Sequence, residues 1–199
     1  MVRPRKFDEA DVSRAIRDEF WDRGYAGTSM SDLLRASGLG KGSLYGAFGD
    51  KHALFLRVLR EYGEDKMSAL RERLETARSG AQVLRDFMLE PAADPTGAAS
   101  RRGCLLANSS AELASVDPDV AAQARQIYSS MTAVLTSAAE RAQRVGEITP
   151  DVDPESVAQA TLAAQLGVVA LGRAGMSPVH LSATAHSAID RILSPPPAR

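Results

Sequence analysis

The sequence lacks several features that define common classes of protein. Among its 199 residues there is one cysteine, Cys104, so a disulfide within the chain is excluded and a reducing compartment is favoured. Aromatic residues make up only 5% of the chain, whereas alanine is abundant, and this balance favours helices over strands. The formal net charge is −1, so no overall field attracts the chain to nucleic acid.

The chain also lacks a long apolar run and a recognisable set of reactive residues. Its most apolar segment, 160–171, is interrupted by Gln165 and is shorter than the roughly 20 residues of a membrane span. No apolar run follows the basic N-terminus, as a signal peptide would require. His52, His180 and His186 have no metal-binding spacing, and no nucleophile–base pair or phosphate loop is found. We therefore expect a cytoplasmic protein with no membrane segment, metal, cofactor or catalytic site.

The most informative stretch is G-L-G-K-G-S-L-Y-G-A-F-G-D-K, from Gly38 to Lys51. Gly38 suits the left-handed turn just past a helix end, and a second helical pattern begins within three residues. Leu44 and Phe48 lie four residues apart, so both can face a core. Because two helical turns are not stable alone, this helix must pack on the preceding helix, 31–37. The layout predicts a helix-turn-helix, whose second helix lies in a DNA major groove.

Two glycines inside the predicted second helix have a functional and a structural interpretation. Gly42 and Gly46 each cost about 1 kcal/mol relative to alanine in a helix. The functional interpretation is that they allow the backbone to approach DNA closely. The alternative is a loose turn that is fixed only by Leu44, Tyr45 and Phe48.

Prolines and capping residues predict where the other helices begin and where one loop lies. Asp50 is a natural cap for a long helix from Lys51, and Asp117-Pro118, Asp153-Pro154 and Ser177-Pro178 suit the starts of three later helices. The segment 90–102 contains Pro91, Pro95 and Gly97 among small residues, so we expect a loop there.

The helix-turn-helix stretch resembles a known signature. Thr28-Ser29, Gly38, Ser43-Leu44-Tyr45, Phe48 and Lys51 resemble, in register, the N-terminal signature of TetR-type (tetracycline-repressor-like) transcriptional regulators, over residues 8–55. Gly40 departs from the family's usual serine at the cap. The segment R-G-C-L-L-A-N-S-S-A-E-L, Arg102 to Leu113, resembles a motif of one subgroup of that family.

The resemblance implies a fold and a domain organisation. We expect an all-α protein of about nine helices. Residues 1–52 would form a three-helix, helix-turn-helix DNA-binding head, and residues 53–194 a helical ligand-binding and dimerisation domain. Residues 195–199, with three consecutive prolines, would be a disordered tail.

The predicted DNA contacts combine chemistry with the resemblance. Lys41 and Ser43 lie near the start of the second helix, where they can reach base edges or phosphates. Tyr45, Thr28, Ser29 and Lys51 resemble phosphate contacts of the family. The basic N-terminal residues would add an arm, unless that segment is a solvated, frayed terminus. The predicted DNA-binding set is Arg3, Arg5, Lys6, Thr28, Ser29, Lys41, Gly42, Ser43, Tyr45, Gly46 and Lys51.

A homodimer is expected, because one helix-turn-helix alone binds weakly and such proteins commonly use paired half-sites. The resemblance implies an interface made by the last two helices, where small and branched residues favour close packing. Alternatively, those residues fill the core of one chain. The candidates are Ala160, Ala163, Ala164, Gly167 and Val168 on one helix, and Leu181, Ala185, Ala188, Ile189 and Ile192 on the other.

A mainly apolar pocket for a small-molecule effector is expected between the long helices. Its candidate residues could equally be ordinary core: Tyr62, Phe87, Met88, Cys104, Tyr128, Met131, Leu135 and Gln165. Cys104 is a small buried hydrophobe in one interpretation. In the other it is a thiol that senses electrophiles or oxidants, next to Arg101 and Arg102.

The sequence therefore predicts a regulator that binds a double-stranded DNA operator, most simply a repressor released by an apolar or electrophilic effector. Two alternatives stay open. One is a helical small-molecule-binding protein or enzyme with a vestigial helix-turn-helix, and the other is a transcriptional activator.

Overall fold

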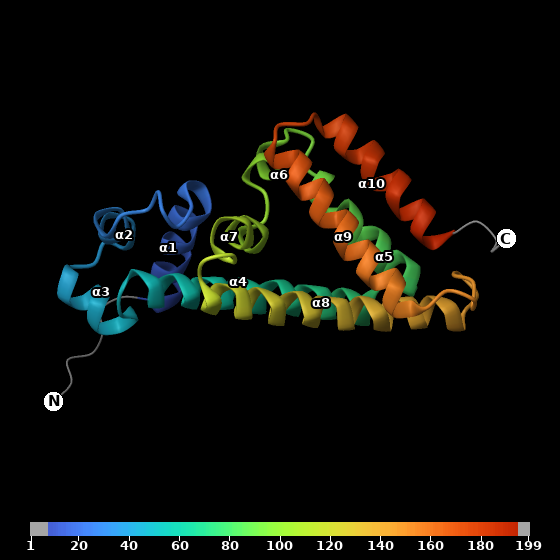
Figure 1. Cartoon of the computed structure of the whole chain (residues 1–199), viewed down its shortest axis with the longest axis horizontal. Coiled ribbons are helices and arrows are strands. Elements are labelled where there is room, and N and C mark those ends of the chain that lie inside the picture. The colour runs from blue at the N-terminus through green and yellow to red at the C-terminus, as the bar shows by residue number, and fades with distance from the viewer. Residues whose placement is uncertain (1–7, 195–199) are drawn as a thin grey trace. The chain divides into compact units, whose positions relative to one another are not determined.

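The computed structural model describes residues 8–194, and within that range it is helical with no strand (Figure 1). The prediction of an all-α fold is confirmed. The described residues form these elements, where η1 is a 3-10 turn: α1 (Glu9–Arg23), α2 (Met30–Ser37), α3 (Lys41–Phe48), α4 (Lys51–Thr76), α5 (Gly80–Leu89), η1 (Glu90–Ala92), α6 (Ala98–Arg102), α7 (Leu105–Leu113), α8 (Pro118–Arg144), α9 (Pro154–Arg173) and α10 (Pro178–Leu193). The predicted tail, 195–199, lies outside the described residues.

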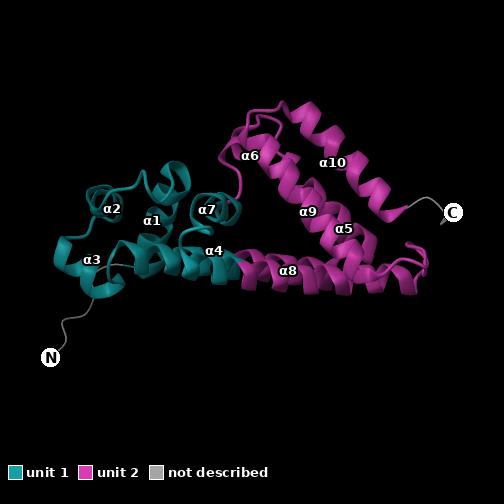
Figure 2. Ribbon diagram, in the orientation of Figure 1, with its two compact units in different colours: residues 1–64, 105–124 teal, residues 65–104, 125–199 magenta. Residues whose placement is uncertain are grey.

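The chain divides into two compact units (Figure 2). Unit 1 is formed by residues 1–64 and 105–124, and unit 2 by residues 65–104 and 125–199. Unit 1 therefore contains the helix-turn-helix together with the first half of α4, all of α7 and the start of α8. The division of function at residue 52 stays a prediction, because the compact units describe packing and not activity.

The helix starts follow the capping chemistry predicted from the sequence. The carboxylate of Asp50 accepts the N–H of Ala53 at 2.8 Å, and the carboxylate of Asp117 accepts the N–H of Val120 at 3.1 Å. Asp153 and Ser177 cap α9 and α10, each with proline in the first turn. Each cap satisfies an N–H group that the first helical turn leaves without a partner.

The segment 90–102 was expected to be a loop, but it contains η1 and α6. Asp94 explains the order, because its carboxylate accepts the N–H groups of Thr96 at 2.9 Å and Ala99 at 2.8 Å. Gly97 then enters α6 with a φ of +70°, which glycine adopts without strain. Local side-chain capping therefore overrides the effect of two prolines and several small residues.

Aromatic side chains, some buried and some half-buried, contact one another in unit 1. Phe20 and Phe55 meet edge to face with ring centroids 5.1 Å apart, and Tyr25 lies 4.9 Å from Phe55. Trp21 contacts Tyr62 in the same manner at 5.0 Å. Edge-to-face contacts suit the charge distribution of aromatic rings and add to the burial of their apolar surface. These contacts join α1 to α4, the two helices on which the helix-turn-helix rests.

Unit 2 is built from helices that approach one another closely. Gly80, at the start of α5, lies against α8, and a β-carbon at this position would be 2.0 Å from the carbonyl oxygen of Ala138. The guanidinium of Arg141 on α8 donates to the carbonyl oxygens of Leu74 and Ala77, each at 2.8 Å. Arg141 thus satisfies carbonyl groups at the end of α4 that lack partners within the helix.

Between residues 8 and 194, none of the helices combines the length and apolar character that crossing a membrane would require.

The close approach at Gly80 generates a stability prediction. Gly80→Ala should lower the free energy of unfolding by about 1–3 kcal/mol, because backbone atoms of α8 occupy the place of the added methyl group. Urea denaturation measures this change. Gly46→Ala is the control: its added methyl group would meet no atom within 4 Å, so it should leave stability unchanged or raise it. Equal stability of Gly80→Ala and the parent would contradict the packing described.

Candidate nucleic-acid interface

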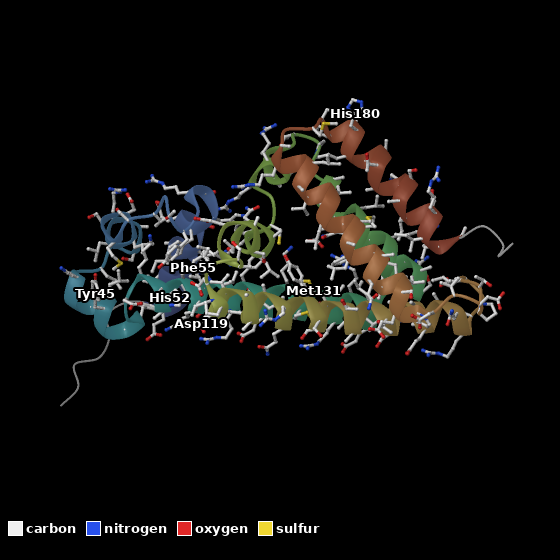
Figure 3. All side chains as sticks on the ribbon, viewed as in Figure 1. Tyr45, His52, Phe55, Asp119, Met131 and His180 are labelled. Atoms are coloured by element: carbon white, nitrogen blue, oxygen red, sulfur yellow. The ribbon has the colours of Figure 1, made fainter. Side chains whose placement is uncertain are left out.

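Helix α3 has one buried face and one exposed face. Leu44 is fully buried and Phe48 is 6% exposed, as their four-residue spacing predicts. The opposite face is exposed and carries Lys41, Gly42, Ser43, Tyr45 and Gly46 (Figure 3 labels Tyr45). The structure thus brings five of the eleven predicted DNA-contacting residues onto one solvent-facing surface.

The orientation of α3 is fixed at its C-terminal end by Arg57 of α4. The guanidinium of Arg57 lies over the ring of Phe48, 4.6 Å from its centroid. It also donates to Glu61 at 2.8 Å and to Glu9 of α1 at 3.2 Å. The hydrogen bond from Arg57 to Glu61 raises the pKa of Arg57, so the guanidinium stays charged. One side chain therefore links the reader helix α3 to both α1 and α4.

The start of α3 presents a positive charge and has no side-chain cap. No side chain caps its first turn, because Gly40 occupies the cap position. The ammonium of Lys41 lies 5.8 Å from the centroid of the Tyr45 ring, one turn further on. The N-terminus of a helix favours anions, since its first N–H groups lack partners and its dipole is positive there. This end of α3 is therefore suited to a phosphate group.

The structure gives no internal reason for Gly42 and Gly46. A β-carbon built at either position would meet no atom within 4 Å, and neither has a positive φ. This differs from Gly80, where a neighbouring helix fills the space. The glycines thus weaken α3 without improving its packing, which is consistent with a contact outside the chain.

Two predicted phosphate contacts, Thr28 and Ser29, form hydrogen bonds with other groups of the protein. Thr28 is 1% exposed and its hydroxyl donates to the carbonyl oxygen of Gly24 at 2.7 Å, so we remove it from the interface. Ser29 caps α2 in a capping box with Asp32, whose carboxylate accepts the N–H and the hydroxyl of Ser29 at 2.9 and 2.6 Å. The N–H and the hydroxyl of Ser29 thus already have an acceptor within the protein.

Sequence reasoning missed Asp32, although the spacing Ser29-x-x-Asp32 is the signal of a capping box. Hydrogen bonds from the Ser29 side chain and backbone, followed by Arg35, hold the pKa of the Asp32 carboxyl far below its usual range. Arg35 and Arg23 both pair with Asp32, so their charges are partly neutralised at this surface.

The remaining basic candidates differ in what the structure says of them. The ammonium of Lys51 lies 4.2 Å from the ring centroid of Tyr25, at the first turn of α4. Lys51 is only half-buried, so its charge still reaches the solvent. Arg3, Arg5 and Lys6 lie outside the described residues.

The predicted dimer surface on α9 and α10 is only partly exposed. Four of its branched or small residues are buried in unit 2, so they fill the core of a single chain: Val168, Leu181, Ala185 and Ile189. Ala160, Ala163 and Gly167 are exposed, and a β-carbon at Gly167 would meet nothing within 4 Å. The periodicity of these helices could not separate the two sets, because both faces of α9 carry small or apolar residues.

The eight predicted effector-binding residues do not belong to one unit. Tyr62 lies in unit 1 against Trp21, whereas the other seven belong to unit 2. Met88 and Leu135 are fully buried, and Cys104, Tyr128 and Gln165 are half-buried. A cavity of about 330 Å³ in unit 2 has a different lining: Asp86, Leu89, Glu90, Ala92, Ala93, Ser182 and His186. The apolar pocket therefore stays a prediction.

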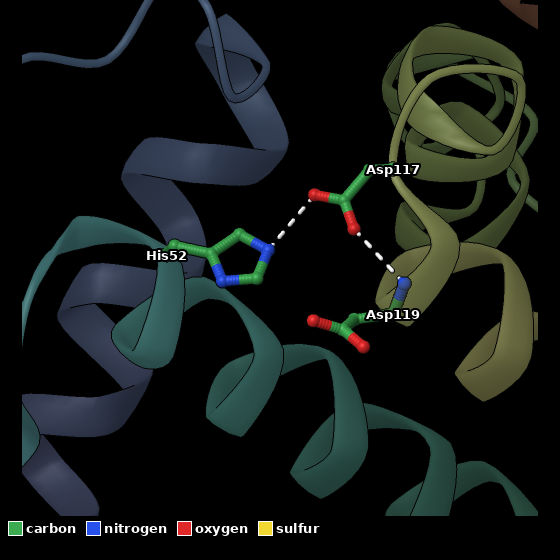
Figure 4. Close-up of side chains that lie close together, drawn as sticks. All are labelled: His52, Asp117 and Asp119. Atoms are coloured by element: carbon green, nitrogen blue, oxygen red, sulfur yellow. Dashed lines mark hydrogen bonds and ion pairs between the residues drawn. The ribbon is translucent and has the colours of Figure 1, made fainter.

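The structure also forms a cluster that the sequence did not predict (Figure 4). His52, Asp117 and Asp119 each offer one potential ligand atom within 4.8 Å of the others. The carboxylate of Asp117 is already engaged: one oxygen lies 2.8 Å from Nε2 of His52, and the other accepts the N–H groups of Asp119 and Val120. Burial alone would raise the pKa of Asp117, but these hydrogen bonds lower it. We therefore assign the cluster to hydrogen bonding between α4 and α8.

Helix α2, the left-handed turn at Gly38 and the two-turn helix α3, buried by one face and exposed by the other, have the layout of a helix-turn-helix DNA-binding protein. Comparison with known proteins specifies the class. Residues 12–58 match the family described as bacterial regulatory proteins, tetR family, and residues 80–188 match the tetracyclin repressor-like C-terminal domain. The chain belongs to the TetR family, as its signature predicted, and is a transcriptional regulator.

Individual relatives agree with this assignment. The uncharacterized HTH-type transcriptional regulator YezE of Bacillus subtilis is 33% identical over 75% of this chain and 79% of its own length. The transcriptional repressor ComR of Escherichia coli is 29% identical over 79% of this chain and 75% of its own length. A solved cysteine mutant of the TetR family regulator CifR, in complex with operator DNA, superposes with a TM-score of 0.77. It is 25% identical and covers 94% of this chain and 98% of its own.

The capping box generates a prediction about pH. The pKa of Asp32 is depressed in the folded state, so its stabilising effect is present above the ordinary carboxyl value near 3.9. That effect is lost as the pH falls from there through the folded-state value. Asp32→Asn should therefore reduce stability at pH 6 and make the fall in stability between pH 5 and 3 shallower. Urea denaturation across this range is the measurement, with the exposed Asp86→Asn as control. Parallel curves for Asp32→Asn and the parent would contradict the box.

Proposed function

We propose that this protein binds a double-stranded DNA operator through the exposed face of α3 and acts as a repressor that a small-molecule effector releases. The proposed contacts are Lys41, Gly42, Ser43, Tyr45 and Gly46, with Lys51 at the start of α4. The relatives ComR and DhaR are described as repressors, which supports repression over activation.

One observation carries the proposal: α3 has glycines on its exposed face where nothing in the protein requires them. Gly42 and Gly46 lie one turn apart beside Lys41 and Tyr45, with open space above both. A surface without β-carbons lets a helix backbone come close to the groove, while the lysine and the tyrosine hydroxyl supply phosphate contacts. Few side chains on this face can read base edges, so DNA shape would contribute to sequence preference.

The proposed assembly is a homodimer through α9 and α10. Support comes from the exposed apolar and small residues of these helices: Ala160, Ala163, Gly167, Leu171 and Val179. Small residues at helical spacing allow two helices to approach closely. Two copies would present two α3 helices to successive half-sites, about 34 Å apart on B-form DNA.

The proposed effector acts on unit 2, and Cys104 is a candidate for its contact. Cys104 is half-buried in the connection between α6 and α7, directly after Gly103, which has a φ of +72°. The cysteines of the related regulator CifR were replaced in its solved complex with operator DNA. An electrophile that modifies Cys104 would act at the first residue before α7. As expected of such a regulator, we place the protein in the cytoplasm.

The glycines give a test that separates DNA binding from stability. Gly42→Ala should raise the free energy of unfolding by up to about 1 kcal/mol, because alanine is the better helix former. The same change should weaken operator binding about tenfold or more, since the methyl group holds the backbone away from the DNA. Fluorescence anisotropy with a fragment selected from the source genome measures affinity. Unchanged or tighter binding by this more stable variant would contradict the proposed approach of α3 to DNA.

The charge on α3 gives a second test. Lys41→Ala should weaken binding to every DNA sequence and reduce the slope of log affinity against log salt by about 1, because one phosphate contact is lost. The control is Arg144→Ala, which removes one exposed positive charge from the end of α8 in unit 2. If both variants change the slope equally, the effect is one of net charge, and the assignment of Lys41 to a phosphate is wrong.

A further inference from the structure

The turn between α1 and α2 is held by a carboxylate from α7. Glu112 accepts the backbone N–H of Tyr25 at 3.0 Å and that of Ala26 at 2.7 Å, one with each oxygen. A carboxylate that accepts two N–H groups makes stronger hydrogen bonds than a neutral acceptor. Gly24 makes room for it, because a β-carbon there would lie 2.7 Å from the nearer oxygen. Its φ of +74° also favours glycine.

A second contact joins the first turn of α4 to the start of α8. Nε2 of His52 lies 2.8 Å from the carboxylate of Asp117 (Figure 4). The other oxygen of Asp117 accepts the N–H groups of Asp119 and Val120 at 3.1 Å each. Asp117 is therefore fixed as the cap at the start of α8, and in that position it also holds the His52 ring.

The two contacts lie on either side of the helix-turn-helix in the sequence. Residues 25–26 come just before α2, and His52 comes just after α3, so the two contacts flank the helix-turn-helix. Both partners, Glu112 and Asp117, lie in the short corner where α7 ends and α8 begins. We propose that this corner, residues 112–117, is a two-point anchor that positions α2 and α3 for DNA, with Glu112, Asp117 and His52 as positioning residues.

The proposal rests on the proposed function and suggests how an effector at Cys104 would act on the helix-turn-helix. The subgroup motif of Arg102 to Leu113 contains Cys104, immediately before α7, and Glu112, in the last turn of α7. Because Glu112 and Asp117 lie in one corner, a displacement of that corner would move both anchoring carboxylates, and with them the two ends of the helix-turn-helix. Coupling between sites requires such an element, whose position differs between the bound and released states.

A bound divalent cation is the rival explanation for one of the two contacts. His52, Asp117 and Asp119 could together hold a metal ion, but Glu112 lies outside that group and has two backbone donors of its own. The anchor therefore predicts that Asp119 is dispensable and that chelators have no effect, whereas a metal site predicts the opposite for both.

The test compares DNA affinity in matched variants of the full chain. Glu112→Ala and His52→Leu should each weaken operator binding by about 5- to 30-fold. Without the anchor, α2 and α3 would have to be ordered when DNA binds, and this ordering costs affinity. His52→Gln, which retains a side-chain N–H donor, should restore part of the loss. Asp119→Asn and Glu140→Gln each remove one exposed charge without breaking the anchor, so they should bind like the parent, with and without EDTA.

A second readout separates failure of the anchor from failure of the proposed function. Hydrogen exchange of the Tyr25 and Ala26 amides should accelerate in Glu112→Ala and stay unchanged in Glu140→Gln, at a temperature where every variant is fully folded by circular dichroism. Parent protein that binds no genomic fragment would sink the proposed function alone. Operator affinity equal to the parent in both Glu112→Ala and His52→Leu would overturn the anchor. The anchor would also be overturned if Asp119→Asn, or treatment of the parent with EDTA, reduced operator affinity as much as His52→Leu does.

Discussion

The structure depends on the anchoring of one helix that cannot be stable alone. Helix α3 has only eight residues, two of them glycine, and no side-chain cap at its start. Its position is determined by the burial of Leu44 and Phe48, and by Arg57, which covers Phe48 and pairs with Glu9 and Glu61. Tertiary contacts hold the inner face of α3. The outer face therefore need not pack against the protein and is available to contact DNA.

The need to hold short helices by tertiary contacts also explains the uneven distribution of the aromatic residues. Seven of the nine aromatic residues between positions 8 and 194 fall in unit 1, where Phe20, Tyr25 and Phe55 form one contact group. Large rings bury much area at a small loss of side-chain freedom, which suits a unit whose helices are short. Unit 2 has longer helices and uses alanine, glycine and branched residues, because long helices gain enough area from close approach.

Polar side chains in unit 1 are arranged around the helix-turn-helix and not only beneath it. Asp32 and Glu112 each accept backbone N–H groups at the start of α2 or in the turn before it. Asp117 accepts N–H groups at the start of α8 and also contacts His52, just after α3. Carboxylates at helix starts and turns fix the backbone there, because they accept N–H groups that have no partner within the helix. They also add negative charge to a DNA-binding unit, which explains why the charge of the chain gave no sign of its partner.

The sequence by itself determined the all-α fold, the start of most helices and the two faces of α3, because these follow from local periodicity, capping and turn chemistry. It also indicated the family, through the resemblance of its helix-turn-helix residues to a known signature. Only the tertiary structure decided that Thr28 is buried and that four of the ten residues expected at the dimer surface fill the core of one chain. It alone joined Glu112 to residues 25–26 across more than eighty positions of the chain. Burial and long-range hydrogen bonds depend on which helices meet, and the pattern along one helix does not contain that information.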